Sequence, residues 1–373
     1  MEPIRVLHIL HSMNRGGAEN AIMNYYRHID RNKVQFDFLL TELDKCQFED
    51  EILSLGGRVF RVPLLTIKNP FPYLTGVWRF YRSHPEYRIV HSHTSSKSFF
   101  PLIIARLCDI PVRIAHCHGT GSKADNGLYT ILRTSLRKPL QLVATDYFAC
   151  GIEAAKWLYG NRNFVSGIVR ILPNVIECEK FSFNNNTRDI IREKHNIKGD
   201  TIVVGATARF SLIKNHPFSV DILASLLKRC PNFILLLVGD GPLRRKIESM
   251  TQEKGLSHKV IITGLVPNVN EYLQAMDFFV MPSFYEGLPL SLVEAQVSGL
   301  KCFVSEGVPK EADITGLVSF LPLEKGPEYW AETIHKEVGY VRRSHIGDVR
   351  KAGYDAAESA VKLQEFYLNA VRQ

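Results

Sequence analysis

The sequence lacks several features that would assign it to a common class. Its seven cysteines include no C-x-x-C pair, which disfavours a zinc ribbon or a dithiol redox centre, and we expect them to be reduced. No apolar run approaches the roughly 18 residues of a membrane-spanning helix. The first residues lead into a strand-like segment without the apolar core of a signal peptide. These absences predict a cytoplasmic protein, at the inner face of the plasma membrane if it contacts a membrane.

Three further absences concern ligands. No Asp-x-Asp pair occurs in the chain, which disfavours binding of a sugar nucleotide through a divalent metal. The G-x-G-x-x-G fingerprint of dinucleotide-binding folds is missing after the first predicted strand, where Gly16 and Gly17 stand instead. Aromatic and basic residues do not alternate as in single-strand binders, which argues against nucleic acid. We therefore expect no metal site, no cofactor and no nucleic-acid partner.

The 373 residues alternate between short apolar runs and amphipathic helical stretches, which predicts parallel sheets covered by helices on both faces. This length suits two domains. Strands are predicted at 4–10, 34–40, 58–62, 89–93, 112–116, 147–150, 170–172, 202–206, 233–238, 260–263, 278–281, 301–304 and 318–321. Helices are predicted at 18–28, 48–55, 73–83, 98–107, 218–229, 243–254 and about 353–371.

A polar stretch at 181–189, which includes three consecutive asparagines, interrupts this alternation and is typical of a linker or loop. We therefore predict an N-terminal Rossmann-like domain at 1–183 and a C-terminal Rossmann-like domain at 184–352. The predicted helix at 353–373 has no strand after it and could pack on either domain.

Two glutamates eight residues apart, Glu286 and Glu294, follow the predicted strand at 278–281. Gly287 indicates a loop, and Pro289 suits the first turn of a helix that contains Glu294. A helix start attracts phosphate because its N–H groups are unpaired. Carboxylates beside an anion site are natural partners of sugar hydroxyls, so the segment predicts a nucleotide-sugar site.

Two cations, Arg209 and Lys214, follow the predicted strand at 202–206, at the strand end where open α/β sheets bind ligands. Arginine matches phosphate oxygens with a fork of donors, and lysine supplies a compact charge. The Gly-Asp-Gly turn at 239–241 and the turn at Gly264 predict further loops at the same sheet edge.

Two histidine pairs, His91 with His93 and His116 with His118, can each share one face of a strand. A zinc site is disfavoured because no cysteine or carboxylate is spaced to complete it. We expect satisfied polar residues at strand ends, or a single histidine that contacts a substrate.

Together these motifs resemble glycosyltransferase family 4, whose members are retaining enzymes of the GT-B fold with two Rossmann-like domains facing across a cleft. The resemblance covers residues 4 to about 300 and is strongest to bacterial capsular and exopolysaccharide enzymes. It rests on Glu-x7-Glu at 286–294, Arg-Phe-Ser-x-x-Lys at 209–214, the Val-Gly-Asp-Gly-Pro turn at 238–242 and Gly-Gly-Ala-Glu at 16–19. It also implies that the C-terminal helix crosses back to the first domain.

The resemblance implies a role for each matching residue. Arg209 and Lys214 would hold the diphosphate, Glu294 the ribose hydroxyls and Glu286 the donor sugar. The remaining implied contacts are His118 near the reaction centre, Gly16 and Gly17 in the loop over the donor, Leu265 at the base, and Gly287, Leu288 and Leu290 at the phosphates. Pro289 stands where many members have glycine, so Leu288 and Leu290 would supply the phosphate contacts.

These residues predict a metal-independent, retaining hexosyl- or N-acetylhexosaminyltransferase. Its donor would be a nucleoside diphosphate sugar, preferably UDP-linked, and its acceptor a hydroxyl of a glycan or lipid-linked acceptor in bacterial surface polysaccharide synthesis. Two alternatives share the diphosphate site: a GT-B UDP-sugar epimerase and a non-catalytic nucleotide-binding protein.

The formal net charge of +8 favours anionic partners, although solubility alone also explains it. Segments 75–82 and 133–138 mix cations with apolar residues, as a surface for peripheral contact with an acidic membrane would. Ordinary solvated helix faces explain these two segments equally well.

Overall fold

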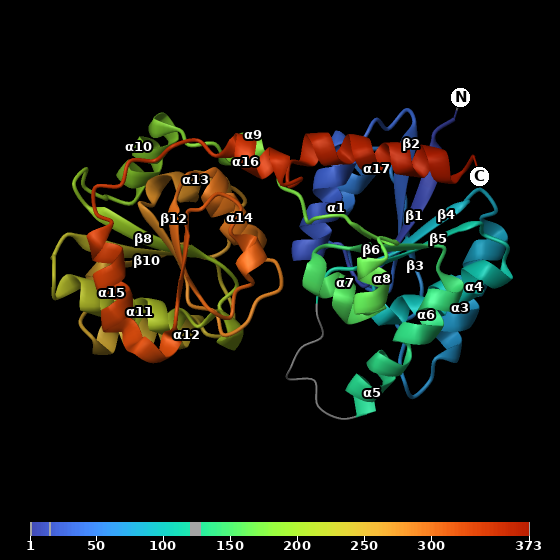
Figure 1. The fold of residues 1–373 in the computed structure, drawn as a ribbon, viewed down its shortest axis with the longest axis horizontal. Coiled ribbons are helices and arrows are strands. Elements are labelled where there is room, and N and C mark those ends of the chain that lie inside the picture. Colours follow the sequence, from blue (N-terminus) through green and yellow to red (C-terminus); the bar gives the residue numbers. More distant parts are fainter. Residues whose placement is uncertain (1, 15, 120–127, 373) are drawn as a thin grey trace. The chain divides into compact units, whose positions relative to one another are not determined.

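The computed structural model describes residues 2–14, 16–119 and 128–372 (Figure 1). The chain divides into two compact units. Unit 1 comprises residues 1–175 and 355–373, and unit 2 comprises residues 176–354. The chain thus leaves unit 1 once and returns to it with its last helix.

Unit 1 is built on a parallel sheet of seven strands in the order β3-β2-β1-β4-β5-β6-β7. The strands are β1 (Ile4–Leu10), β2 (Val34–Leu40), β3 (Val59–Arg61), β4 (Ile89–Ser92), β5 (Val112–Cys117), β6 (Asp146–Ala149) and β7 (Val169–Ile171). The buried apolar runs of β1 and β2 pair along their whole length, from Ile4 beside Val34 to Leu10 beside Leu40. Apolar residues on both faces of a strand require helices on both sides of the sheet.

Two apolar cores lie on the two faces of this sheet. One packs α1 (Gly17–His28), α2 (Glu49–Ser54) and α17 (Ala356–Ala370) against it, and α1 and α17 run over the same side in Figure 1. The other contains α3 (Phe71–Ser83), α4 (Phe99–Leu107), α6 (Arg137–Val143) and α7 (Ile152–Tyr159). Two further helices are α5 (Leu128–Ser135) and α8 (Asn161–Val165).

Unit 2 repeats the design with six parallel strands in the order β10-β9-β8-β11-β12-β13. They are β8 (Ile202–Thr207), β9 (Phe233–Val238), β10 (Val260–Ile262), β11 (Phe278–Met281), β12 (Lys301–Ser305) and β13 (Val318–Leu321). One face carries α10 (Asn185–Lys194), α13 (Val269–Ala275) and α14 (Leu290–Val297), and the other carries α11 (His216–Leu227), α12 (Arg244–Glu253) and α15 (Gly326–Lys336) (Figure 1). The remaining helices are α9 (Cys178–Phe181) and α16 (Ile346–Lys351).

The prediction of a linker at 181–189 was wrong. Residues 178–181 form α9 and residues 185–194 form α10. The side-chain oxygen of Asn184 accepts a hydrogen bond from the Thr187 N–H at 2.9 Å, so the first asparagine of the run caps a helix. Residues 176–183, predicted as part of the first domain, belong to unit 2.

The last helix also begins later than expected, at Ala356, where the Asp355 carboxylate accepts from the Glu358 N–H at 3.1 Å. This helix belongs to unit 1. No helix in the described part of the chain is both long and apolar enough to span a bilayer.

Candidate functional site

The candidate site of unit 2 lies where its strand order reverses. Strands β8 and β11 are neighbours in the sheet, although β9 and β10 lie between them in the sequence. Ligands of open α/β sheets bind beside the carboxyl ends of the strands at such a switch point. Arg209 and Lys214 follow β8, and Glu286 follows β11, so both predicted motifs stand at this edge.

Lys214 and Glu286 meet in an ion pair, with 2.6 Å between Nζ and Oε1. The Glu286 side chain is 9% exposed, and its backbone N–H donates to the Gly307 carbonyl at 3.0 Å. A buried carboxylate is costly without a partner. The lysine therefore compensates a charge that the fold has withdrawn from water, and the pair fixes both side chains.

Two loops hold this pair in place. The Phe284 N–H donates to the Ile213 carbonyl at 2.8 Å, and the Asn215 side-chain amide donates to the Pro282 carbonyl at 3.1 Å. Asn215 has a φ of 53°, a left-handed conformation that asparagine adopts more readily than most residues. The loops after β8 and β11 are thereby joined on both sides of Lys214.

Gly307 allows the segment after β12 to pack closely against the loop that carries Glu286. A Cβ atom at this position would lie 2.3 Å from the Phe284 carbonyl oxygen. The Ser305 hydroxyl donates to the Ser283 carbonyl in the same region. The segment 305–307 thus supports the loop that carries Glu286.

Arg209 is exposed and makes no ion pair or side-chain hydrogen bond within the described residues. Its loop is fixed by the neighbouring turn, since the Phe210 N–H donates to the Asp240 carbonyl at 2.9 Å. Gly239 allows this contact, because its φ is 141° and a Cβ there would lie 2.1 Å from the Ala208 carbonyl oxygen. A guanidinium on a fixed loop is available for an anionic ligand.

The turn after β10 joins the same edge of the sheet. The Gly239 N–H donates to the Gly264 carbonyl at 3.1 Å. Leu265, the next residue, is 79% exposed. An apolar side chain and its backbone are therefore open to a ligand beside the Gly-Asp-Gly turn.

Helix α14 begins at Leu290. Pro289 was predicted in its first turn, but it is the cap residue that precedes the helix. Gly287 and Leu288 are partly exposed in the preceding loop. Glu294 lies in the middle of the helix, where burial raises the pKa of its carboxyl to about 7. Such a shifted carboxyl group is typical of functional sites.

The predicted residues of unit 1 stand at the ends of its strands. Gly16 is the cap of α1 and Gly17 its first residue, while Arg15 of the same loop lies outside the described residues. A Cβ at Gly17 would meet nothing within 4 Å. Packing within the described part of unit 1 therefore gives no reason for glycine at position 17.

The two predicted histidine pairs converge and are joined by His8. His93 Nε2 lies 2.9 Å from His8 Nδ1, and His93 Nδ1 lies 2.8 Å from His118 Nε2. His91 Nε2 lies 3.2 Å from His116 Nδ1. The five rings form one cluster, rather than two separate pairs at strand ends.

Both ring nitrogens of His118 have partners within unit 1, since Nδ1 donates to the Asn174 Oδ1 at 3.0 Å and Nε2 faces His93. Burial lowers the pKa of His118 to about 4, although the hydrogen bond to Asn174 opposes this shift. The ring is neutral at physiological pH and is firmly oriented. The residue is partly exposed, so part of its surface stays open to a ligand.

Three residues of these sites were not predicted: His8, Asn174 and Tyr367. The Tyr367 hydroxyl lies 2.6 Å from His91 Nδ1, across 276 residues of sequence. His8 could have been recognised as a polar residue within the apolar run of residues 6–10. No local signal points to Asn174 or Tyr367.

Comparison with known proteins assigns the family. Residues 187–317 match the model described as glycosyl transferases group 1, and residues 15–180 match glycosyltransferase family 4. The putative glycosyltransferase EpsF of Bacillus subtilis is 39% identical over 97% of this chain and 96% of its own length. This chain belongs to glycosyltransferase family 4. The capsular polysaccharide biosynthesis glycosyltransferase CapH of Staphylococcus aureus is 26% identical to this family 4 enzyme, over 98% of this chain and 99% of its own length.

Solved structures show that the fold of this glycosyltransferase is GT-B. HepE of Anabaena in complex with UDP aligns with a TM-score of 0.76 and 15% identity, over 97% of this chain and 99% of HepE. WaaG, a glycosyltransferase of lipopolysaccharide biosynthesis, aligns with a TM-score of 0.66 and 17% identity, over 96% of this chain and 95% of WaaG. The two parallel α/β domains predicted from the alternating pattern, and the GT-B fold implied by the resemblance, are confirmed.

Proposed function

We propose that this enzyme transfers a sugar from a UDP-sugar to a hydroxyl of a glycan or lipid-linked acceptor in bacterial surface polysaccharide synthesis, with retention of configuration. The sugar would be a hexosyl or N-acetylhexosaminyl group. The observation that carries the proposal is the Lys214–Glu286 pair at the switch point of unit 2, where Arg209 stands in the same segment after β8 as Lys214.

The names of related proteins support the donor and the pathway. HepE was crystallised with UDP and with UDP-glucose. CapH is named for capsular polysaccharide biosynthesis. An Escherichia coli relative, 27% identical over 59% of this chain and 58% of its own length, is named as a galactosyltransferase that uses UDP-Gal and a sugar-diphosphoundecaprenol. A UDP-linked donor and a lipid-linked acceptor fit these names.

The two cations would stabilise the leaving diphosphate. When the bond from the anomeric carbon breaks, negative charge builds on the phosphate oxygens, and fixed cations at that place lower the barrier. Lys214 has three N–H donors, and Glu286 accepts from one of them. The other two can donate to phosphate while the ion pair keeps the ammonium in position.

The other residues would hold the donor along its length. Glu294 would accept from the ribose hydroxyls, and Glu286 would bind hydroxyls of the sugar. The backbone of Leu265 would meet the base, and the start of α14, with Gly287, Leu288 and Leu290, would meet the phosphates. From unit 1, His118 would lie near the reaction centre, and Gly16 and Gly17 would cover the donor.

Neither glutamate would serve as acid or nucleophile. Glu286 is occupied by Lys214, and the resemblance indicates attack on the same face from which the diphosphate leaves. The acceptor hydroxyl would form the new bond to the anomeric carbon and give its proton to the departing phosphate. We infer that transfer needs neither a divalent metal nor a cofactor, since the chain has no Asp-x-Asp pair and two cations already serve the diphosphate.

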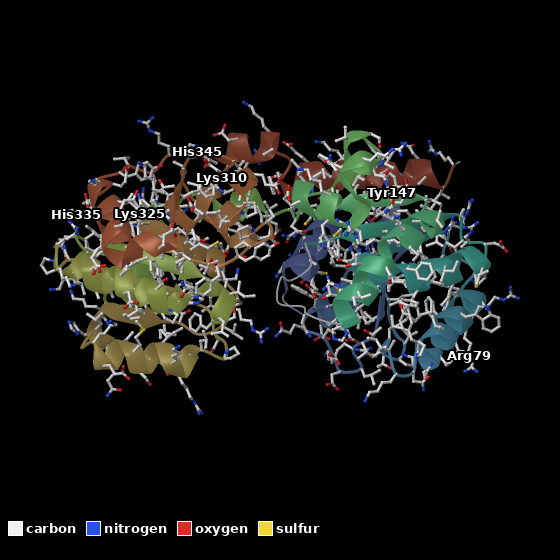
Figure 2. All side chains as sticks on the ribbon, turned by 60° about the horizontal axis from the view of Figure 1, so that its bottom comes forward. Arg79, Tyr147, Lys310, Lys325, His335 and His345 are labelled. Atoms are coloured by element: carbon white, nitrogen blue, oxygen red, sulfur yellow. The ribbon has the colours of Figure 1, made fainter. Side chains whose placement is uncertain are left out.

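A face of unit 1 supports peripheral contact with an acidic membrane. Phe71 and Trp78 on α3 are 70% and 49% exposed, and Arg79 and Arg82 are exposed beside them. Arg79 points away from the ribbon in Figure 2. Apolar rings with nearby cations are typical of helices that rest in a bilayer interface.

This face continues onto α4 and α6, where Leu107 and Leu142 are exposed and the Arg106 guanidinium donates to the Leu142 carbonyl at 2.9 Å. In the second predicted segment, the guanidinium groups of Arg133 and Arg137 lie 5.3 and 5.4 Å from the centre of the Trp157 ring. These two cations pack on the protein itself. The helices α3, α4 and α6 therefore carry the membrane proposal, and it would place the enzyme at the inner face of the plasma membrane.

A donor screen tests the proposed reaction against its two alternatives. The enzyme is incubated with UDP-sugars, with and without lipid-linked acceptors, and UDP and sugar products are measured. A transferase releases UDP mainly when an acceptor is present. An epimerase converts the UDP-sugar without an acceptor, and a nucleotide-binding protein releases no UDP.

A further inference from the structure

The histidine cluster of unit 1 has an arrangement that a hydrogen-bond network alone does not account for. One ring nitrogen from each of His93, His116 and His118 lies within 4.8 Å of the others. A second group, His8 with His91 and His93, meets the same criterion, and within the described residues no other group does. Both groups contain His93, so they cannot each hold an ion through the same ring nitrogen.

Two ring nitrogens of the cluster, His116 Nε2 and His8 Nε2, are buried and have no well-oriented hydrogen-bond partner within the described residues. The Leu172 backbone lies close to the His116 ring in the same cavity. A buried polar atom without a partner costs about 1–3 kcal/mol. The rings line a cavity of about 10 Å³, which is about the space that one small particle such as a water molecule occupies.

The partners of the rings determine which nitrogens can face an ion. His118 Nδ1 carries its hydrogen because it faces the Asn174 Oδ1 at 3.0 Å, so His118 Nε2 has the lone pair. His116 Nδ1 faces His91 at 3.2 Å, which leaves His116 Nε2. His93 Nδ1 stands 2.8 Å from His118 Nε2. Ligands of a tetrahedral zinc site lie about 3.3 Å apart when each bond is about 2.0–2.1 Å, so His93 Nδ1 and His118 Nε2 would have to separate by about 0.5 Å. The His116 ring, whose centre is 4.0 Å from that of His118, would have to turn toward the same point.

We propose that His93 Nδ1, His116 Nε2 and His118 Nε2 bind one divalent transition-metal ion of the Zn²⁺ type. Imidazole nitrogens suit zinc and its neighbours, and three histidines leave a fourth position open to water. His93 and His118 are partly exposed, which gives an ion a route into the cluster.

Each proposed ligand has a second residue that orients its ring. Asn174 holds His118, His91 holds His116, and His8 holds His93 across 2.9 Å. Tyr367 holds His91 in turn at 2.6 Å. Metal-binding histidines almost always have such a partner on the other ring nitrogen. The strongest argument for the site is that each of the three proposed ligands has such an orienting partner.

Binding requires only a change of tautomer. Without the ion, the His93 Nδ1–H donates to His118 Nε2, and the His8 Nδ1–H donates to His93 Nε2. With the ion, His93 Nδ1 binds the metal, the His93 hydrogen moves to Nε2, and it donates to His8 Nδ1. The His8 hydrogen moves to its own Nε2, so the number of protons in the network is unchanged.

This proposal does not rest on the proposed transfer reaction. All of the histidines involved belong to unit 1, whereas Arg209, Lys214 and Glu286 belong to unit 2. The ion would orient the rings, including His118, and stabilise unit 1. It has no role in neutralising the diphosphate.

Metal titration of the full chain tests the site. Chain treated with a chelator is titrated with Zn²⁺ by calorimetry, and with Co²⁺ by visible absorption. We expect one ion per chain, a dissociation constant in or below the micromolar range, a higher Tm with Zn²⁺, and the strong Co²⁺ absorption of a four-coordinate site. His93→Ala should weaken binding at least about 100-fold and Asn174→Ala about 10–100-fold, while His258→Ala, at an exposed position of unit 2, should leave it unchanged.

Three results would overturn the proposal. They are the absence of saturable one-to-one binding by the wild-type chain, the weak Co²⁺ absorption of a six-coordinate ion, and wild-type affinity in His93→Ala. If His93→Ala does not fold, the partly exposed His118 is changed instead. Wild-type metal affinity in His118→Ala would likewise overturn the proposal. The outcome is independent of the donor screen, because it measures binding rather than turnover.

Discussion

Lys214 Nζ lies 2.6 Å from Glu286 Oε1, and this contact joins the loops that follow two neighbouring strands of unit 2. The two residues are 72 positions apart in sequence, and the strand order brings them together. The Glu286 side chain is 9% exposed, and Lys214 is its cationic partner. The same cation is the one that a diphosphate at the switch point would meet.

The pair gives a prediction that separates stability from turnover. Lys214→Ala leaves the Glu286 carboxylate without its partner, and should lower the free energy of unfolding by about 1–3 kcal/mol. The double variant Lys214→Ala with Glu286→Gln removes the unpaired charge and should recover most of that loss. Turnover should stay at least about 100-fold below wild type in both variants, because the diphosphate has lost a cation.

Denaturant unfolding and steady-state kinetics on the same preparations measure both effects. Lys228→Ala is the matched control, since Lys228 pairs with Glu328 at 3.8 Å on an exposed surface, and its removal should change stability by less than about 0.5 kcal/mol. Recovery of turnover in the double variant would show that Lys214 serves only to balance Glu286.

Glu294 gives a prediction about pH. Its folded-state pKa of about 7 lies above the ordinary 4.5, so the folded state binds this proton more tightly than the unfolded state does. The stabilisation that this more tightly bound proton gives the folded state is fully present below about pH 4.5. It is lost as the pH rises through 7. Between pH 4.5 and 8 the loss should be on the order of 2–3 kcal/mol in the chain without ligand.

Glu294→Gln removes this titration, and the control is Glu253→Gln on the exposed surface of α12. Free energies of unfolding at several pH values should fall less steeply for Glu294→Gln than for the wild type and the control. Equal pH dependence in all three chains would mean that Glu294 is not held in a desolvated position.

Gly307 predicts a structural effect on donor binding. A Cβ at this position would lie 2.3 Å from the Phe284 carbonyl oxygen, so Gly307→Ala must displace the loop that carries Glu286. We expect a stability loss of about 1–3 kcal/mol and a higher KM for the donor. Gly199→Ala, where a Cβ meets nothing within 4 Å, is the control. Wild-type stability and KM in Gly307→Ala would contradict the described packing of this loop.

The membrane face is tested by flotation with vesicles. The enzyme should float with vesicles of phosphatidylcholine and phosphatidylglycerol, and much less with phosphatidylcholine alone. Arg79→Glu with Arg82→Glu, on α3, should abolish flotation with the anionic vesicles. The control is Arg245→Glu with Lys246→Glu at exposed positions of α12, which changes the net charge by the same amount. This control should have little effect on flotation. An equal loss from both reversals would mean that net charge, rather than this face, drives binding.

Much of the fold could be predicted because its strands are continuous apolar runs between turns. All thirteen predicted strands are present, most with bounds within one residue of the prediction, as for β2 (Val34–Leu40) and β9 (Phe233–Val238). Helix α10 was missed because its start resembles a loop. The polar Asn184 is the residue type that a helix cap needs, so the same letters indicate a loop or a helix start.

The sites were harder to predict, because they depend on strand order. Arg209, Lys214 and Glu286 could be named from their places after strands. The ion pair could not, since it requires that β8 and β11 be neighbours. The histidine cluster likewise requires β4 to lie between β1 and β5, and α17 to bring Tyr367 to His91. Spacing along the chain carries no information about either arrangement.

Acceptor-dependent release of UDP by the wild type and by Arg209→Ala tests the central claim most directly. Arg209 is exposed and has no ion pair within the described residues, so its removal should leave stability unchanged. We predict that the wild type releases UDP from at least one UDP-sugar when a lipid-linked acceptor is present, and that Arg209→Ala is at least about 100-fold slower. Arg245→Ala should match the wild type. The absence of acceptor-dependent UDP release from every UDP-sugar, or wild-type turnover in Arg209→Ala, would contradict the account.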